Sequence, residues 1–254
     1  MTDHAGGHRL WLRGAAEMAD QVSRIAPEYR RVPVPRPVAV HWTHILSSPR
    51  ALSDEIAPLM KLFTDVITLP AVPNVVGAIA LDWYKQPLDD IDPYEWPNTE
   101  VGELVYRSKY RFKFHPKLRG RFGLDITSRM CAAIERHPGF KGADVVVNVP
   151  GHDSAQVSFG SQLAATVAKE TQKPFVKLRA KDSFRPEAKS AEPEQRAEVI
   201  RGQFSVPRSL DGMIALIIDD VVHSGESMRE TARAALATGA NLVYALCAVR
   251  TRRS

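Results

Sequence analysis

Apolar and polar residues follow two different periods in the second half of the chain. The three- to four-residue spacing of an amphipathic helix occurs in residues 123–137, 159–169 and 228–237. Short apolar runs of the kind that form buried strands occupy residues 145–149, 174–178, 215–218 and 241–249. Helices that alternate with strands favour a parallel sheet with helices on its faces, so we expect an α/β fold here.

The first 100 residues have a weaker pattern. The elements expected there are helices over residues 9–25 and 53–63 and a strand over residues 38–45. Residues 82–98 are acidic, aromatic and rich in proline, which is typical of a loop at a domain boundary. We therefore predict two domains, an unassigned α+β region at residues 1–100 and an α/β domain at residues 101–254.

Two acids follow the apolar run 215–218 and precede a loop of small residues. Asp219 and Asp220 would lie at the carboxyl end of the strand, where open α/β sheets bind their ligands. The loop 221–227 leads into the helix expected at 228–237, and backbone N–H groups at such a helix start bind phosphate. Because carboxylates accept hydrogen bonds from vicinal hydroxyls, the segment indicates a sugar-phosphate site. A core strand that ends in a solvated acidic turn is the alternative.

The loop after the two acids lacks the sequences of the common nucleotide-binding loops. It has neither the lysine of G-x-x-x-x-G-K-[ST] nor the glycines of G-x-G-x-x-G, so nucleotide hydrolysis and dinucleotide binding are poorly supported. Asp219 and Asp220 would hold the hydroxyls of the sugar. The residues expected around the 5′-phosphate are Val222, His223, Ser224, Gly225, Glu226 and Ser227.

Positive charge is concentrated in residues 106–121. The chain has a net charge of +5 and a pI of about 9.3, a balance that suits a polyanionic partner. This segment has seven cations and no acid, with tyrosines and phenylalanines between them. Lys109, Arg111 and Lys113 are candidates for anion binding, and single-stranded nucleic acid that stacks on the rings is a candidate partner. The alternative is an amphipathic strand, because aromatic residues and cations alternate at period two.

Composition argues against three other kinds of protein. No apolar stretch approaches the roughly 20 residues that cross a bilayer, so no membrane partner is expected. The first residues lack the charged-then-apolar order of a secretory signal. Cys131 and Cys247 fall in a predicted helix and strand and are expected to be reduced, which favours a cytoplasmic location. With no Cys-x-x-Cys in the sequence, we expect no zinc site.

The residue order in 215–227 resembles the binding motif for phosphoribosyl pyrophosphate (PRPP) in type I phosphoribosyltransferases. It has four apolar residues, two acids, three variable residues, Ser, Gly, one residue and Ser. From about residue 103 to residue 252 the chain also resembles the ComF family of competence-associated phosphoribosyltransferases. The segments that carry this resemblance are 108–110, 144–150, 196–204, 215–227, 239–240 and 250–252. The family's zinc ribbon is missing, and Val199 stands where the family often has asparagine.

The resemblance implies a type I phosphoribosyltransferase-like sheet that binds PRPP together with Mg²⁺. The metal would be held mostly by PRPP itself, and no metal ligand is assigned to the protein. The pyrophosphate loop would comprise Pro150, Gly151, His152 and Asp153, although the arginine-rich run that the family has next is absent. A mobile lid at residues 179–201 would bring the catalytic candidates, Lys189 and Arg196, to the leaving group.

Two functions fit these residues. In the first, the chain is a Mg²⁺-dependent phosphoribosyltransferase that displaces pyrophosphate from PRPP with an unidentified acceptor. In the second, a non-catalytic protein keeps the PRPP pocket as a sensor and binds nucleic acid through residues 106–121. The segment after Met228 is too short to cover an acceptor. A cover must come from the first 100 residues, from residues 106–121 or from a partner subunit, so a homodimer is a candidate assembly.

Overall fold

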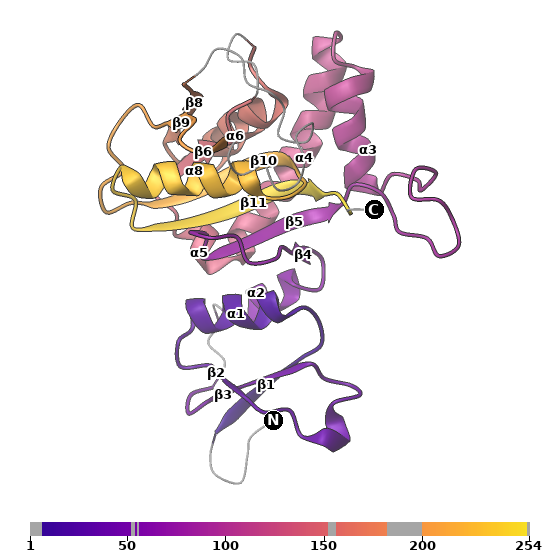
Figure 1. Ribbon diagram of the computed structural model, residues 1–254, viewed down its shortest axis with the longest axis vertical. Coiled ribbons are helices and arrows are strands. Elements are labelled where there is room, and N and C mark those ends of the chain that lie inside the picture. The colour runs from indigo at the N-terminus through magenta and orange to yellow at the C-terminus, as the bar shows by residue number, and fades with distance from the viewer. Residues whose placement is uncertain (1–6, 52–53, 55, 152–155, 182–199, 253–254) are drawn as a thin grey trace.

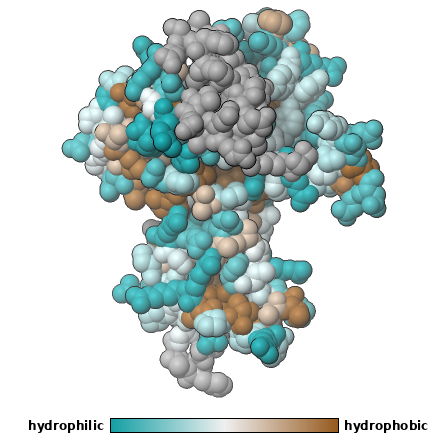
Figure 2. Space-filling model, in the orientation of Figure 1, coloured by the Kyte–Doolittle hydropathy of each residue, from teal (hydrophilic) through white to brown (hydrophobic). Residues whose placement is uncertain are grey.

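The computed structural model describes residues 7–51, 54, 56–151, 156–181 and 200–252. Four predicted site residues lie outside the described residues, namely His152, Asp153, Lys189 and Arg196. Within the described ranges, no helix is both long and apolar enough to span a membrane. Hydrophilic residues cover most of the face in Figure 2, with hydrophobic patches on both its upper and its lower part.

A six-stranded sheet organises the larger part of the chain (Figure 1). Its strands, in spatial order, are β4 (Ile67–Thr68), β5 (Gly77–Trp83), β11 (Leu242–Arg250), β10 (Ile214–Val222), β6 (Val145–Asn148) and β7 (Phe175–Val176). Every neighbouring pair is parallel except β4 with β5. The inner strands β10 and β11 are apolar almost throughout, as strands covered on both faces require. The predicted α/β class is confirmed.

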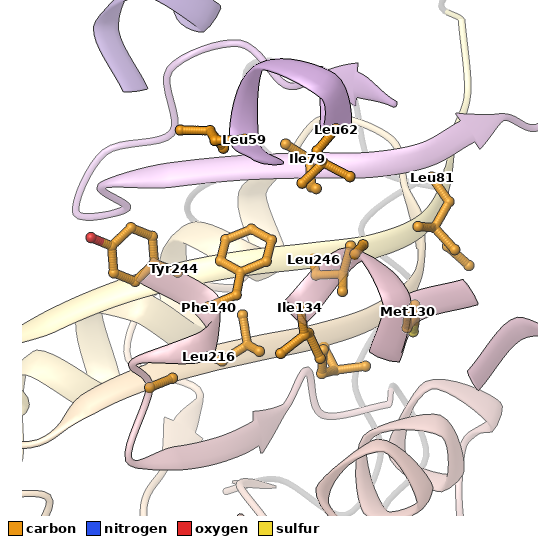
Figure 3. Close-up of a cluster of buried hydrophobic side chains, with 14 of the residues drawn as sticks. Leu59, Leu62, Ile79, Leu81, Met130, Ile134, Phe140, Leu216, Tyr244 and Leu246 are labelled. Carbon is orange, nitrogen blue, oxygen red and sulfur yellow. The ribbon is translucent and has the colours of Figure 1, made fainter. Parts of the chain in front are cut away.

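Helices pack on both faces of this sheet and bury two separate cores. The helices of the first face are α3 (Glu100–Tyr106), α4 (Pro116–Arg136), α5 (Pro138–Lys141) and α6 (Phe159–Glu170). The second face is covered by α8 (Glu226–Ala237). Leu216 of β10 belongs to the first core and Ile217 to the second, because successive side chains of a strand point to opposite faces. Figure 3 shows Leu216 and Leu246 beside Ile134 and Phe140 in the first core.

A smaller antiparallel sheet lies at the amino terminus, in the order β1 (His8–Leu12), β3 (His44–Ser48) and β2 (Arg30–Val32). The helical elements with it are α1 (Ala16–Ile25), the 3-10 turn η1 (Arg36–Val38) and α2 (Ile56–Leu62). The helix predicted over residues 9–25 begins only at Ala16, and residues 9–12 belong to β1, because pairing of β1 with β3 outweighs the helical spacing. The strand predicted from residue 38 begins only at His44, after a turn that the neighbouring prolines favour.

The basic segment at residues 106–121 is helical, so the amphipathic strand considered for it is wrong. Thr99 caps α3 by accepting the N–H of Gly102, and α3 runs directly into the π-helical turn η2 (Arg107–Arg111). After a short turn, α4 begins at Pro116. Residues spaced by four share one side of a helix, so a period-two pattern of this length also fits a helix.

The central sheet takes strands from both sides of the division predicted at residue 100. β5 is parallel to β11, with Ala78 opposite Ala245 and Trp83 opposite Arg250. The next residue, Tyr84, donates its N–H to the carbonyl of Arg250 at 2.8 Å. A separate ribbon pairs β8 (Arg179–Ala180) with β9 (Phe204–Ser205). The first 100 residues therefore complete the sheet that carries the candidate site.

Candidate functional site

Asp219 and Asp220 lie near the carboxyl end of β10, between β11 and β6. The backbone orients both carboxylates. Asp219 Oδ1 accepts the N–H of Asp220 at 2.9 Å, and Asp220 Oδ1 accepts the N–H of Val221 at 2.9 Å. Gly160, near the start of α6, packs so closely that a Cβ there would lie 3.0 Å from Asp219 Oδ1. The acids are therefore fixed at the edge where such sheets bind ligands.

Lys109 reaches these acids from the π-helical turn η2. Its Nζ lies 2.8 Å from Asp220 Oδ2, and the Asp220 side chain is only 9% exposed. The sequence placed Lys109 in a basic surface segment without connecting it to the paired acids. The helical turn brings this side chain to the acids, whereas Arg111 and Lys113 stay exposed. The signal that could have found it is the lysine–aromatic pair of residues 109 and 110.

Burial and charge act in opposite directions on this cluster. Burial raises the pKa of Asp219 well above its usual value, and the charge of Asp220 raises it further. Burial by itself would lower the pKa of Lys109, but the charge of Asp220 and the hydrogen bond to it outweigh burial and raise this pKa. The lysine therefore stays protonated beside Asp220, while Asp219 binds a proton more readily than a free aspartate does.

The turn from β10 into α8 leaves the start of the helix open. Gly225 is the N-cap residue of α8 and has φ +81°, a left-handed conformation that favours glycine. No side chain from the described residues caps this helix, so its first amide groups are directed at the loop. Ser224 and Ser227 are partly exposed beside it, and Glu226 pairs with Arg229 at 2.6 Å. The turn thus offers amide and hydroxyl donors to an anion.

Two residues of this turn are fastened to the tail that follows β11. The carbonyl of Val222 accepts the N–H of Thr251 at 3.0 Å. The hydroxyl of Thr251 lies 2.8 Å from His223 Nδ1. The Val222 side chain is buried in the second core, so only its backbone can take part in the predicted phosphate site.

A buried asparagine that the sequence motifs did not predict as a site residue fixes the end of the neighbouring strand β6. Asn148 ends β6, and its Oδ1 accepts the N–H of Leu178 at 2.9 Å. Its Nδ2 donates to Ser161 Oγ at 2.8 Å. Pro150 and Gly151 follow at the same edge as Asp219, because β6 and β10 are parallel neighbours. A lone asparagine inside the apolar run V-V-V-N-V is the signal that could have found it.

The other two cations predicted in the basic segment lie away from the acids. Arg111 packs over the ring of Phe112, with 5.6 Å between the guanidinium carbon and the ring centroid. Lys113 packs over Phe114 at 5.6 Å in the same way. Both cations are exposed. The structure therefore separates Lys109, which belongs to the acid cluster, from a surface group of cations and rings.

The carboxyl-terminal part of the chain matches a known family. Residues 157–254 match the family model described as a phosphoribosyl transferase domain. The matched residues include the paired acids and the turn into α8, whereas Lys109 and β6 precede them. The acid cluster thus combines residues inside the match with a lysine from outside it.

Several solved structures are similar to this chain. The adenine phosphoribosyl transferase from Trypanosoma brucei is 15% identical over 73% of this chain and 86% of its own, with a TM-score of 0.41. The orotate phosphoribosyltransferase from Aeropyrum pernix is 19% identical over 51% and 64%, with a TM-score of 0.32. The phosphoribosylpyrophosphate synthetase from Mycobacterium smegmatis is 15% identical over 49% and 33%, with a TM-score of 0.33. A search of the curated proteins gave no match.

Proposed function

We propose that the chain binds PRPP at the carboxyl edge of β10 and transfers its phosphoribosyl group to an acceptor, with release of pyrophosphate. The observation that carries this proposal is the position of Asp219 and Asp220. They stand at the end of an inner parallel strand, directly before an open helix start, inside the residues that match the phosphoribosyl transferase domain. A sugar with vicinal hydroxyls and a 5′-phosphate suits both features.

Each part of PRPP has a partner in this arrangement. The ribose hydroxyls would donate to Asp219 and Asp220, and the 5′-phosphate would accept from the amides and hydroxyls of residues 222–227. The pyrophosphate would lie toward the end of β6, where Gly151 lets the backbone approach closely. Lys189 and Arg196 remain the proposed lid cations, and His152 and Asp153 the remaining proposed residues of the pyrophosphate loop.

Lys109 and a ribose hydroxyl would compete for the carboxylate of Asp220. Asp220 holds the lysine before PRPP arrives, and a ribose hydroxyl needs the same carboxylate. The lysine has three N–H donors on a flexible stem, so it can move its ammonium toward the phosphates while Asp220 accepts the hydroxyl. Binding would then exchange one charged hydrogen bond for another, which leaves neither charge unpaired.

The reaction requires the bond from C1 of ribose to the pyrophosphate oxygen to break while an acceptor nitrogen bonds to C1. Positive charge develops on the sugar and negative charge on pyrophosphate. Mg²⁺ bound to the phosphates would stabilise the leaving charge. Among the described residues no group of three or more His, Cys, Asp and Glu side chains could hold a metal. In this proposal the metal would arrive with PRPP and keep phosphate and water ligands.

Calorimetric titration with PRPP and Mg²⁺, followed by an assay of pyrophosphate release with a panel of bases and amines, tests the proposal. Binding together with release that depends on one of the acceptors is expected. If PRPP does not bind, the proposal is wrong. Binding without release from any acceptor would contradict the transferase activity and favour a protein that senses PRPP.

A second candidate function rests on four exposed apolar side chains in and near the basic segment. Tyr106, Tyr110, Phe114 and Leu118 are spaced by four and are 39%, 54%, 85% and 41% exposed. Cations stand between them, and rings beside cations suit stacked single-stranded nucleic acid. Such binding should weaken steeply as salt increases, since counterions are released from the phosphates. Fluorescence anisotropy with a labelled single-stranded DNA at two salt concentrations measures it, and no binding at low salt would contradict it.

Three finer assignments are proposals as well. The segments named above support a ComF-like relationship, although the zinc ribbon of that family is missing from the sequence. The reduced cysteines expected from the sequence support a cytoplasmic location. A homodimer would supply a cover for the acceptor, and analytical ultracentrifugation measures the assembly directly.

A further inference from the structure

Two tryptophans and two arginines meet at the carboxyl edge of the central sheet. Trp83 ends β5, and Arg250 ends the neighbouring strand β11. The guanidinium carbons of Arg250 and Arg252 lie 5.1 Å and 5.4 Å from the centroid of the Trp83 ring. Arg252 also lies 5.9 Å from the ring of Trp96. Trp96 belongs to the loop between β5 and α3, which Figure 1 shows starting beside the end of β11.

These two cations pack on the same ring. In the described part of the chain, neither Arg250 nor Arg252 forms a salt bridge. Burial lowers the pKa of Arg250; the charge of Glu17 opposes this effect, and the like charge of Arg252 adds to it. Two like charges beside the same aromatic ring repel each other, so an anion between them would be stabilised.

The group is adjacent to the turn that follows β10. In the register of the sheet, Val222 stands opposite Arg250, and Arg250 stands opposite Trp83. Neighbouring strands are about 4.8 Å apart, so Trp83 lies roughly 10 Å from the end of β10. The residue between the two arginines, Thr251, is bonded to both Val222 and His223. The tail that carries Arg252 is thus fixed to the phosphate turn.

The leaving group and the acceptor are expected on opposite sides of β10. β6 and its loop lie on one side, and β11 and β5 on the other. The proposed pyrophosphate site is on the β6 side. Direct displacement at C1 brings the acceptor in on the face opposite the leaving group. An acceptor must therefore approach from the side of β11, where the tryptophans and arginines stand.

We infer that the acceptor subsite is formed by Trp83, Trp96, Arg250 and Arg252. The acceptor would be a planar heteroaromatic acid or an aromatic amine that carries an anionic substituent. This inference rests on the proposed phosphoribosyl transfer. Arg252 is exposed and can leave the indole ring to pair with the carboxylate, while the planar ring of the acceptor stacks in its place. The acceptor nitrogen bonds to C1 as pyrophosphate leaves with the electron pair of the broken bond. An N–H acceptor then loses its proton to solvent, whereas a pyridine nitrogen has none to lose.

Matched acids and neutral compounds test this subsite by binding and by activity. The pairs are nicotinate with nicotinamide, anthranilate with anthranilamide, and orotate with uracil. Each is titrated calorimetrically into the full chain in the presence of PRPP and Mg²⁺, and pyrophosphate release is then measured. We expect at least one acid to bind at least about tenfold more tightly than its neutral partner and to give the faster release.

Arg252→Gln is the informative variant, and Arg36→Gln, an exposed arginine of the 3-10 turn, is the matched control. Arg252→Gln should abolish the preference for the acid and leave the Kd of PRPP within about twofold; Arg36→Gln should change neither. If every acid binds no more tightly than its neutral analogue, or if the preference for the acid survives in Arg252→Gln, the proposed acceptor subsite is wrong. Either result leaves the proposed phosphoribosyl transfer untouched. If PRPP itself fails to bind to the unaltered chain, the proposed function is wrong and the subsite falls with it.

Discussion

At the scale of single residues, the ion pair of Lys109 with Asp220 compensates part of the negative charge of the two neighbouring acids. Two neighbouring carboxylates near the end of a buried strand would repel each other and lose hydration. The lysine supplies one compensating charge, and the backbone N–H groups of residues 220 and 221 supply hydrogen bonds. The acids are therefore ready to accept hydroxyl groups.

Asp220→Asn should weaken PRPP binding without unfolding the chain. The amide keeps the shape of the carboxylate but loses its charge and one acceptor oxygen. We expect the Kd of PRPP to rise about 10- to 100-fold, the loss of one charged hydrogen bond. Calorimetry and thermal melting measure the two effects, with Asp125→Asn, an exposed acid of α4, as the control. An unchanged Kd would remove Asp220 from the site.

Lys109→Met keeps most of the side-chain stem and removes the charge. The free energy of unfolding should fall by about 1–2 kcal/mol, less than for a fully buried pair because the lysine side chain is 33% exposed. Combined with Asp220→Asn, it should cost less than the sum of the single changes, since each removes the same interaction. Urea unfolding of the unaltered chain, the two single variants and the double variant gives the coupling free energy between residues 109 and 220. Strictly additive losses would mean that the pair does not stabilise the fold.

His137 gives the stability a dependence on pH. It is buried, and its ring stacks on Phe140 with 3.6 Å between centroids. Burial lowers the pKa of His137 to about 3, whereas histidine in an unfolded chain has a pKa of about 6.5. Below pH 6.5 the unfolded chain therefore binds a proton that the folded chain does not bind. This residue's contribution to stability is complete above about pH 6.5 and is lost as the pH falls toward 3.

His137→Phe should flatten that dependence. Phenylalanine can stack on Phe140 but cannot titrate. It also cannot accept the N–H of Phe140, as His137 Nδ1 does at 3.3 Å, so a cost of about 1 kcal/mol is expected at every pH. Urea unfolding at pH 5 and pH 7 measures the difference. The same change between the two pH values in both proteins would contradict the role of His137.

At the scale of elements, one side chain connects the end of β6 to two neighbouring segments. Asn148 connects the end of β6 to Leu178, which follows β7, and to Ser161 in the first turn of α6. Ser161 in turn receives a hydrogen bond from Ser158. The start of the proposed pyrophosphate loop is therefore fixed by two strands and a helix.

Asn148→Val should destabilise the fold by about 2–4 kcal/mol, because it leaves the N–H of Leu178 buried without its acceptor. Ser158→Ala removes a single hydrogen bond and one helix cap and should cost about 1 kcal/mol. Thermal and urea unfolding rank the two variants. Equal losses in both would show that the asparagine does not anchor the loop.

Sequence patterns predict the local elements well and the long-range contacts poorly. The strand–acids–loop–helix order around β10 could be predicted because all its signals lie within 25 residues. The helical conformation of residues 106–114 could not be predicted. A spacing of two residues fits a strand, but it also contains the spacing of four that fits a helix. The contact of Lys109 with Asp220 joins residues more than 100 positions apart, and no local pattern encodes such a pair.

At the scale of the whole molecule, the amino-terminal region and the residues that match the family model share one sheet. β11 has β10 on one side and β5 on the other. Ile79 and Leu81 of β5 lie in the same core as Leu246 of β11, with α2 packed against them (Figure 3). Removing the first 100 residues would uncover both the edge and part of a face of β11.

Residues 101–254 alone should therefore not fold stably, although they contain the predicted domain. An unpaired apolar strand with an exposed face is prone to aggregation. Residues 64–254, which keep β4 and β5, should unfold at a higher temperature and remain more soluble than residues 101–254. Size-exclusion chromatography and thermal melting compare the two. A cooperative transition and PRPP binding in residues 101–254 would show that the domain is independent.

The place of β5 in the sheet also has a consequence during synthesis of the chain. Its partner strand β11 is encoded about 170 residues later. At roughly 5–20 residues per second, the ribosome needs on the order of 10–30 s to make that partner. Throughout this interval a nascent strand rich in alanine, isoleucine and leucine has β4 alone to pair with. Chaperones that bind extended apolar segments should therefore engage this chain before its last strand emerges.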